Sequence, residues 1–238
     1  MASNDRIGAG NRLLRRKAQP PDAGDNGNPD GIPRLTGAPC PDIRFGLCCL
    51  FRAESVRFRT TTATAVGHLP RNEQLLKLSA LCRHNAEQLL AALQTCVRLE
   101  IGAFRILSQF FPLAAHPQLG YRLVDLPGSC EIRNRLAQVA ALRAGHDLRL
   151  SFHPDQFVLL NSPRPEVVAA SIAELEYQEA IATLVGAEVI NLHLGGAYGD
   201  KPTAIRRFVA TWKRLPAGLR HRLSIENDDR QYAPAELL

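Results

Sequence analysis

Histidine and glutamate side chains stand where apolar runs end in the second half of the chain. His153 follows the run LRLSF, His193 lies near the end of VINLHLGG, and Glu226 closes LSI. His116 lies in the loop PLAAHP, which follows a fourth run, AFRIL. Imidazole nitrogens and carboxylate oxygens are the donors that Mn, Zn or Fe accept in proteins. We therefore expect these four residues to bind a metal and to carry metal-assisted catalysis.

A structural role is the alternative for each of these histidines taken alone, because a histidine in an apolar context is more often a hydrogen-bonded core residue. Four ligand-type side chains at equivalent strand ends are harder to explain in that way. The remaining histidines fall in expected helices or connecting loops and are interpreted as structural: His68, His84, His146 and His221. The chain has no phosphate-loop lysine motif, GxSxG elbow or HExxH helix, which argues against the enzyme classes built on them.

The elements that must position these residues follow a repeated order of strand and helix. Strands are expected at 43–51, 103–107, 148–153, 188–196 and 222–228, and helices at 72–99, 131–144, 165–185 and 203–215. This order implies a parallel sheet with right-handed crossovers, which could be an open doubly wound sheet or a barrel. Ligand-type residues at the C-terminal ends of several strands favour the barrel. We therefore predict an α/β fold, a TIM-type (β/α)8 barrel that is incomplete here, with about five strand–helix units.

Composition indicates one globular domain behind a disordered tail. Residues 1–41 are rich in Gly, Pro, Asn and Asp and are expected to be disordered, whereas residues 42–238 should form the barrel. The net charge of +6 weakly favours a polyanionic partner. No two cysteines have the spacing of a zinc or redox motif, and no apolar run is long enough for a membrane span. We therefore expect a cytoplasmic protein with reduced thiols.

The run RTTTAT near the first expected helix could supply donors to phosphates. Arg59, Thr60 and Thr61 carry guanidinium and hydroxyl groups, and Lys201 offers an ammonium group on the same rim of the expected barrel. A threonine-rich loop that only leads into a helix is an equally good interpretation of the run.

Five segments, in this order, resemble the UV damage endonuclease family: FRI, PLAAHP, LSFHPDQFVLLNSP, NLHLGGAYGDK and IENDD. The resemblance extends from about Ile43 to the C-terminus. It implies a TIM barrel related to apurinic endonucleases, and an enzyme that nicks double-stranded DNA on the 5′ side of UV photoproducts and other distortions, initiating excision repair. It also implies a divalent metal cluster on His116, His153, His193 and Glu226. Manganese is the expected metal, with Mg, Co and Zn as alternatives, and a monomer is the expected state.

The same resemblance gives a role to the residues after His153. Gln156 and Phe157 match the glutamine and aromatic pair that probes the DNA helix at the lesion. A distorted base step is already partly unstacked, so flipping it costs less than flipping a normal step. The alternative for Phe157 is a buried aromatic that leads into the apolar residues after it.

Two other functions stay open on the sequence. A metal-dependent sugar isomerase on the same type of barrel would use similar ligands, turn over sugars and show no preference for damaged DNA. A non-catalytic fragment that binds damaged DNA would have a salt-dependent affinity and leave the strand intact. Members of the family continue through about three further strands, so we expect this chain to be truncated at its C-terminus. This truncation is why a non-catalytic fragment is considered.

Overall fold

The computed structural model describes residues 44–227 and 231–236. The tail expected at residues 1–41 lies outside the described residues, so the domain boundary stays a prediction. Among the described helices, none combines the length and the apolar composition that crossing a bilayer would require.

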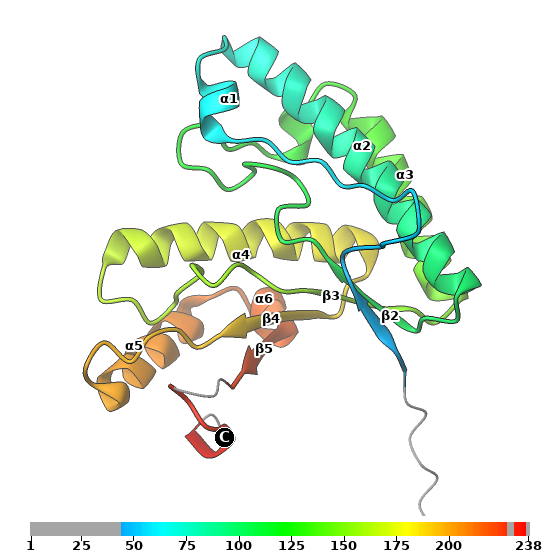
Figure 1. The fold of residues 1–238 in the computed structure, drawn as a ribbon. Coiled ribbons are helices and arrows are strands. Elements are labelled where there is room, and N and C mark those ends of the chain that lie inside the picture. Colours follow the sequence, from blue (N-terminus) through cyan, green and yellow to red (C-terminus); the bar gives the residue numbers. More distant parts are fainter. Residues whose placement is uncertain (1–43, 228–230, 237–238) are drawn as a thin grey trace, which may run out of the picture. The chain divides into compact units, whose positions relative to one another are not determined.

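A parallel sheet forms the centre of the described chain (Figure 1). Its strands are β1 (Gly46–Cys48), β2 (Ala103–Ile106), β3 (Arg149–Phe152), β4 (Val189–His193) and β5 (Leu223–Glu226). Each strand pairs in parallel with the next one along the chain. A doubly wound sheet would reverse its strand order at one point, whereas a barrel keeps the sequential order. The expected α/β fold of barrel type is therefore confirmed, with five barrel strands in the described part of the chain.

Helices connect the strands, and the four expected ones are confirmed. The helices are α1 (Ala63–Gly67), α2 (Arg71–Arg98), α3 (Ser129–Gly145), α4 (Pro165–Val185), α5 (Lys201–Arg214) and α6 (Ala217–Arg222), with short 3-10 turns η1 (Leu123–Asp125) and η2 (Pro234–Glu236). Helix α4 begins at a proline in its first turn and ends before Gly186, whose φ of 73° is left-handed. The sequence did not predict α1 or α6, because five or six residues show too little periodicity.

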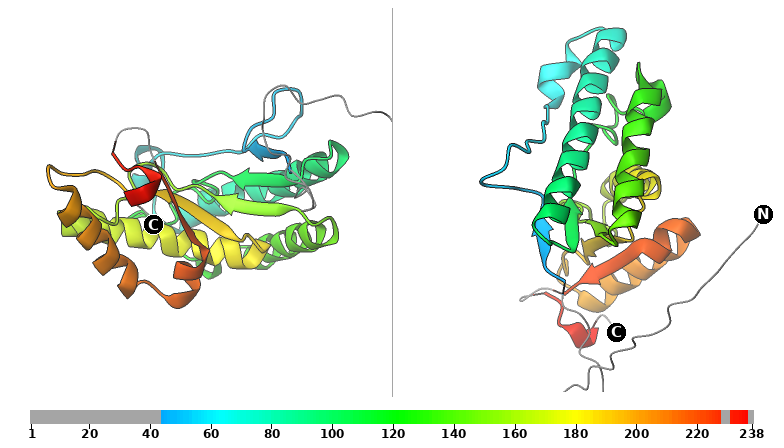
Figure 2. Two further views of the ribbon diagram at one scale, coloured as in Figure 1. Left: turned by 90° about the horizontal axis from the view of Figure 1, so that it is seen from below. Right: turned by 90° about the vertical axis from the view of Figure 1, so that its right-hand side faces the viewer.

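The two faces of the sheet differ in polarity because side chains alternate along each strand. One face is buried and contacts the helices, with α2 packed on β2 and α4 on β3; Figure 2 shows this arrangement in two further views. This helix face carries Phe104, Ile106, Leu150, Phe152, Ile190 and Leu192. The opposite face, here called the inner face, carries Cys48, Arg105, Ser151, Asn191 and Ser224. In a barrel the inner face lines the interior, so polar groups there are available for a site.

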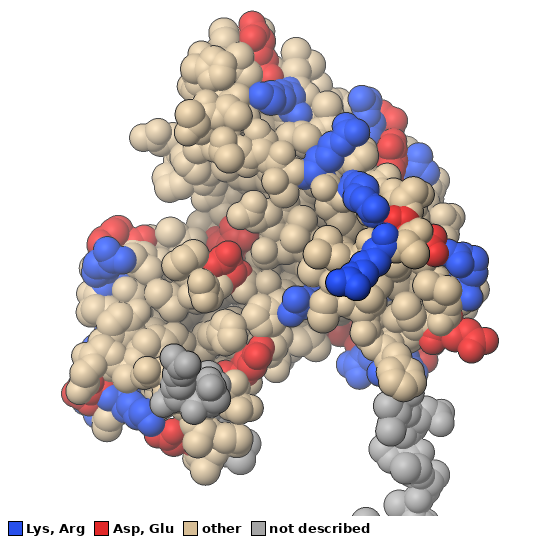
Figure 3. Space-filling model, in the orientation of Figure 1, with Lys and Arg blue, Asp and Glu red and all other residues tan. Residues whose placement is uncertain are grey.

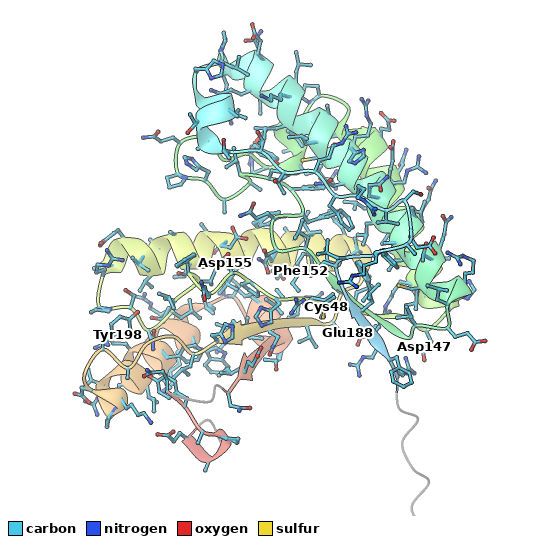
Figure 4. All side chains as sticks on the ribbon, viewed as in Figure 1. Cys48, Asp147, Phe152, Asp155, Glu188 and Tyr198 are labelled. Carbon is cyan, nitrogen blue, oxygen red and sulfur yellow. The ribbon has the colours of Figure 1, made fainter. Side chains whose placement is uncertain are left out.

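The two ends of the strands also differ. Figure 4 labels Asp147 and Glu188, which precede β3 and β4, and Asp155 and Tyr198, which follow them at the opposite end. Glu188 forms ion pairs with two arginines, which ties the start of β4 to its neighbours. The C-terminal ends of the strands are where a barrel places its chemistry.

Candidate metal centre

Three of the expected metal ligands come together at the C-terminal ends of β3, β4 and β5. His193 and Glu226 are the last residues of their strands and are direct neighbours in the sheet. His153 follows β3 directly, on the inner face by alternation. The possible ligand atoms of the three side chains all lie within 4.8 Å of one another. The register of the sheet thus assembles a group that could hold a metal ion.

The His153 ring is oriented from both sides. Its Nδ1 lies 3.1 Å from the carbonyl oxygen of Pro154, and its Nε2 lies 2.7 Å from Oε2 of Glu226. When Nδ1–H donates to the carbonyl, Nε2 presents a lone pair to a carboxylate oxygen. Two acceptors at that distance repel each other unless a proton or a metal ion lies between them. The contact therefore fits a cation site.

The donor set fits a divalent transition metal. Two imidazoles and one carboxylate are typical ligands of such ions and leave coordination positions open for water or substrate. The rings of His153 and His193 lie edge to face, with centroids 5.0 Å apart. The side chain of His153 is 20% exposed and that of Glu226 is 41% exposed, so a substrate can reach the group from solvent.

Asn191 is a site residue that the sequence interpretation missed. It lies two positions before His193 on β4, and its Nδ2 donates to Oε2 of Glu226 at 2.7 Å. The sequence does contain a signal for this residue. Side chains alternate between the two faces of a strand, so a polar residue two positions before a ligand lies on the same face as the ligand.

His116 does not join this group in the described structure. It lies in the loop between β2 and η1, and its Nδ1 accepts hydrogen bonds from the backbone N–H groups of Gln118 and Leu119, both at 3.2 Å. Nε2 then carries the ring proton in this arrangement. Gly120 closes the same turn, since a Cβ there would lie 2.6 Å from the carbonyl oxygen of His116. The role of His116 as a ligand stays a prediction.

The residues after His153 form an exposed turn. Asp155 Oδ1 accepts a hydrogen bond from the backbone N–H of Phe157, and Gln156 is exposed between them. Phe157 is 73% exposed, so its alternative position in the core is wrong. The surface is hollowed between α1 and α4 (Figure 3), where Thr61, Asp155 and Phe157 help to line a cavity of about 560 Å³.

Asn85 of α2 fixes the loop that holds the expected phosphate-binding residues. It is fully buried, accepts from the Arg59 N–H and donates to the carbonyl oxygens of Arg59 and Phe110. Thr60 is exposed, and Thr62 caps α1 through its hydroxyl, so part of the run does lead into a helix.

Lys201 has partners of its own. Its Nζ lies 2.9 Å from Oε1 of Glu236 and 5.6 Å from the ring centroid of Tyr232. The proposed phosphate contacts of Arg59, Thr60, Thr61 and Lys201 stay predictions.

The Glu226 carboxyl should link stability to pH. The hydrogen bond from His153 is the main cause that lowers the pKa of Glu226. Because its folded pKa lies below the unfolded value of about 4.3, the carboxylate stabilises the fold above that pH, and the contribution is lost as the pH falls through the folded pKa. Its exposure limits the effect to below about 1 kcal/mol. Denaturant unfolding in the presence of a chelator measures this. The free energies of unfolding of the protein and of Glu226→Gln should converge as the pH falls, and a difference that stays constant over the whole acid range would contradict the prediction.

Comparisons with known proteins show which family this chain resembles. Residues 43–238 match the family model of UV-endonuclease UvdE. The chain is 34% identical to the UV DNA damage endonuclease of Bacillus cereus (strain Q1) and 36% identical to that of Bacillus thuringiensis subsp. konkukian (strain 97-27). Each match spans 183 residues, 76% of this chain and 56% of the relative. This chain thus spans about half the length of the curated relatives it matches.

A solved structure, described as the crystal structure of SacUVDE, has a similar fold. It superposes with a TM-score of 0.71 at 30% identity, covering 82% of this chain and 64% of that one. The family match spans the whole sheet and all three clustered residues, so the chain belongs to the UV-endonuclease UvdE family.

Proposed function

We propose that this chain is a metal-dependent endonuclease that nicks double-stranded DNA on the 5′ side of UV photoproducts and other helix distortions. The group of His153, His193 and Glu226, at the ends of three neighbouring strands of a UvdE-family chain, carries the proposal. Double-stranded DNA is the proposed partner, and the protein is proposed to act as a monomer.

The three residues suit phosphodiester hydrolysis. A divalent ion held there, with manganese as the expected metal, would bind a phosphate oxygen, activate a water molecule and neutralise charge on the leaving oxygen. His153 and His193 supply nitrogen donors, and the Pro154 carbonyl holds the His153 ring in the required orientation. Glu226 supplies a negative charge, because a glutamate is already ionised at neutral pH and no proton has to leave it when a metal binds.

The turn after His153 suits the detection of damage. Phe157, four residues after His153, exposes a large apolar surface, and such a surface gains from contact with the face of a base. Gln156 precedes it and offers both a donor and an acceptor. Inserting this pair into a base step costs less where the step is already unstacked, which gives preference for damage without a base code.

Replacing Gln156 by alanine should weaken discrimination between damaged and normal duplex. The loss of a hydrogen bond worth about 1 kcal/mol corresponds to about fivefold in the ratio of the two affinities. Fluorescence anisotropy with an irradiated and an untreated duplex measures this ratio. Gln94→Ala, which removes an exposed glutamine from α2, is the matched control. Equal ratios for both variants would remove Gln156 from lesion recognition.

Nicking of supercoiled plasmid tests the proposed activity directly. The 238-residue protein is incubated with irradiated and untreated plasmid, with manganese and with a chelator. We expect manganese-dependent conversion to the open circle that is confined to the irradiated plasmid. Tight binding to irradiated plasmid without conversion would overturn the proposed activity and favour a binding role. Sugar turnover with no effect on either plasmid would favour an isomerase.

A further inference from the structure

Asn191 contacts the candidate metal ligand Glu226 from the adjacent strand. Its carboxamide Nδ2 donates to Oε2 of Glu226 at 2.7 Å. The same oxygen lies 2.7 Å from Nε2 of His153. Oε2 therefore has two polar partners, His153 directly after β3 and Asn191 within β4.

The two contacts of Oε2 would respond differently to a bound metal ion. A cation bound between His153 and Glu226 would replace their direct contact, because both side chains would then be ligands. The carboxamide of Asn191 is uncharged and donates from outside the group of three ligands, so its hydrogen bond would not have to break when a cation binds. Asn191 would then hold the carboxylate in the same orientation with and without the metal.

From this geometry we propose that Asn191 is a positioning residue, which fixes the Glu226 carboxylate so that it meets the cation together with His153 and His193. The proposal deepens the proposed function and rests on it, because it assumes that the cluster binds a metal. Partners that hydrogen-bond to a metal ligand typically change metal affinity by about 10–100-fold when they are removed. We expect a loss of that size without Asn191.

Ser224 offers a matched control. It is the direct neighbour of Asn191 in the pairing of β4 with β5, and it lies on the same inner face, two positions before Glu226. No hydrogen bond joins its side chain to the described residues. Its removal changes the polarity of the inner face and leaves the carboxylate contacts in place.

The test is a titration of the metal-free protein with manganese, followed by calorimetry, for the unchanged chain, Asn191→Leu and Ser224→Ala. We expect about a 10–100-fold weaker dissociation constant for Asn191→Leu and an unchanged one for Ser224→Ala. The visible absorption of the cobalt-loaded protein should also change in Asn191→Leu alone, because the geometry around the ion changes. Asn191→Ser, which cannot reach Glu226, replaces the leucine variant if that variant does not fold.

The outcomes separate the two proposals. Equal affinities and equal cobalt spectra for the unchanged chain and the Asn191 variants would overturn the positioning role while the metal site stands. A loss of metal-free stability in the variants, with affinity unchanged, would assign Asn191 a structural role and also overturn the inference. Absence of manganese binding by the unchanged chain would overturn the proposed function itself.

Discussion

A His153→Ala variant should lose more than about 100-fold of its manganese-dependent nicking of irradiated plasmid, and its affinity for manganese should fall with it. His153 supplies a nitrogen donor, and its Nε2 lies 2.7 Å from Oε2 of Glu226. Its removal leaves two of the three clustered ligands and a Glu226 carboxylate that has lost this contact. Removing a direct ligand should weaken metal binding more than removing a residue that only orients a ligand. The upper end of the effect expected for an orienting residue, about 100-fold, is therefore the lower bound for His153→Ala. Gel analysis of plasmid and a manganese titration measure the two losses.

His221→Ala is the control for this substitution. His221 is an exposed histidine of α6, outside the clustered group, so its removal should leave nicking and manganese affinity unchanged. Binding of irradiated duplex should survive in His153→Ala, because the exposed turn at Gln156 and Phe157 is intact. Nicking retained by His153→Ala would remove this histidine from the site.

Gly195→Ala should lower the free energy of unfolding by about 2–6 kcal/mol. The φ of Gly195 is 102°, which a residue with a side chain rarely adopts. An added Cβ would also overlap Oδ1 of Asn161, a fully buried side chain whose Nδ2 donates to the carbonyl oxygen of Gly196, so moving it aside would break this hydrogen bond. Backbone strain and overlap contribute about 1–3 kcal/mol each.

Gly199→Ala separates these two causes. Gly199 has a similar φ of 79°, but a Cβ there would meet no atom within 4 Å. This variant should therefore lose only the contribution from strain, about 1–3 kcal/mol. Urea unfolding of both variants without metal measures the difference. Equal losses would show that the contact between Asn161 and Gly195 does not constrain the loop after His193.

The sequence was sufficient to predict those helices whose first and last residues are of types typical of helix ends. Helix α4 begins and ends as predicted, because Pro165 fits a first helical turn and Gly186 adopts a left-handed φ. The meeting of His193 with Glu226 also follows from a general rule, since parallel strands bring their C-terminal ends to one edge.

The sequence was insufficient where a loop decides the position. The stretch after β2 has no periodicity from which its path could be predicted. In the structure the His116 ring accepts hydrogen bonds from backbone N–H groups of the turn that follows it. Asn191 differs, because only the register of β4 against β5 brings its side chain to Glu226, and no short motif gives that register. Tertiary contacts such as those of Asn85 with Arg59 join residues that no short motif connects.

The position of the cut on a defined duplex tests the central claim most directly. The substrate is an end-labelled duplex with a single cyclobutane pyrimidine dimer, compared with the same duplex undamaged, and the 238-residue protein is added with manganese or with a chelator. We predict one manganese-dependent nick on the 5′ side of the dimer and none in the undamaged duplex. Cutting that is equal in both duplexes, or that persists in the chelator, would contradict a lesion-directed metal centre at His153, His193 and Glu226.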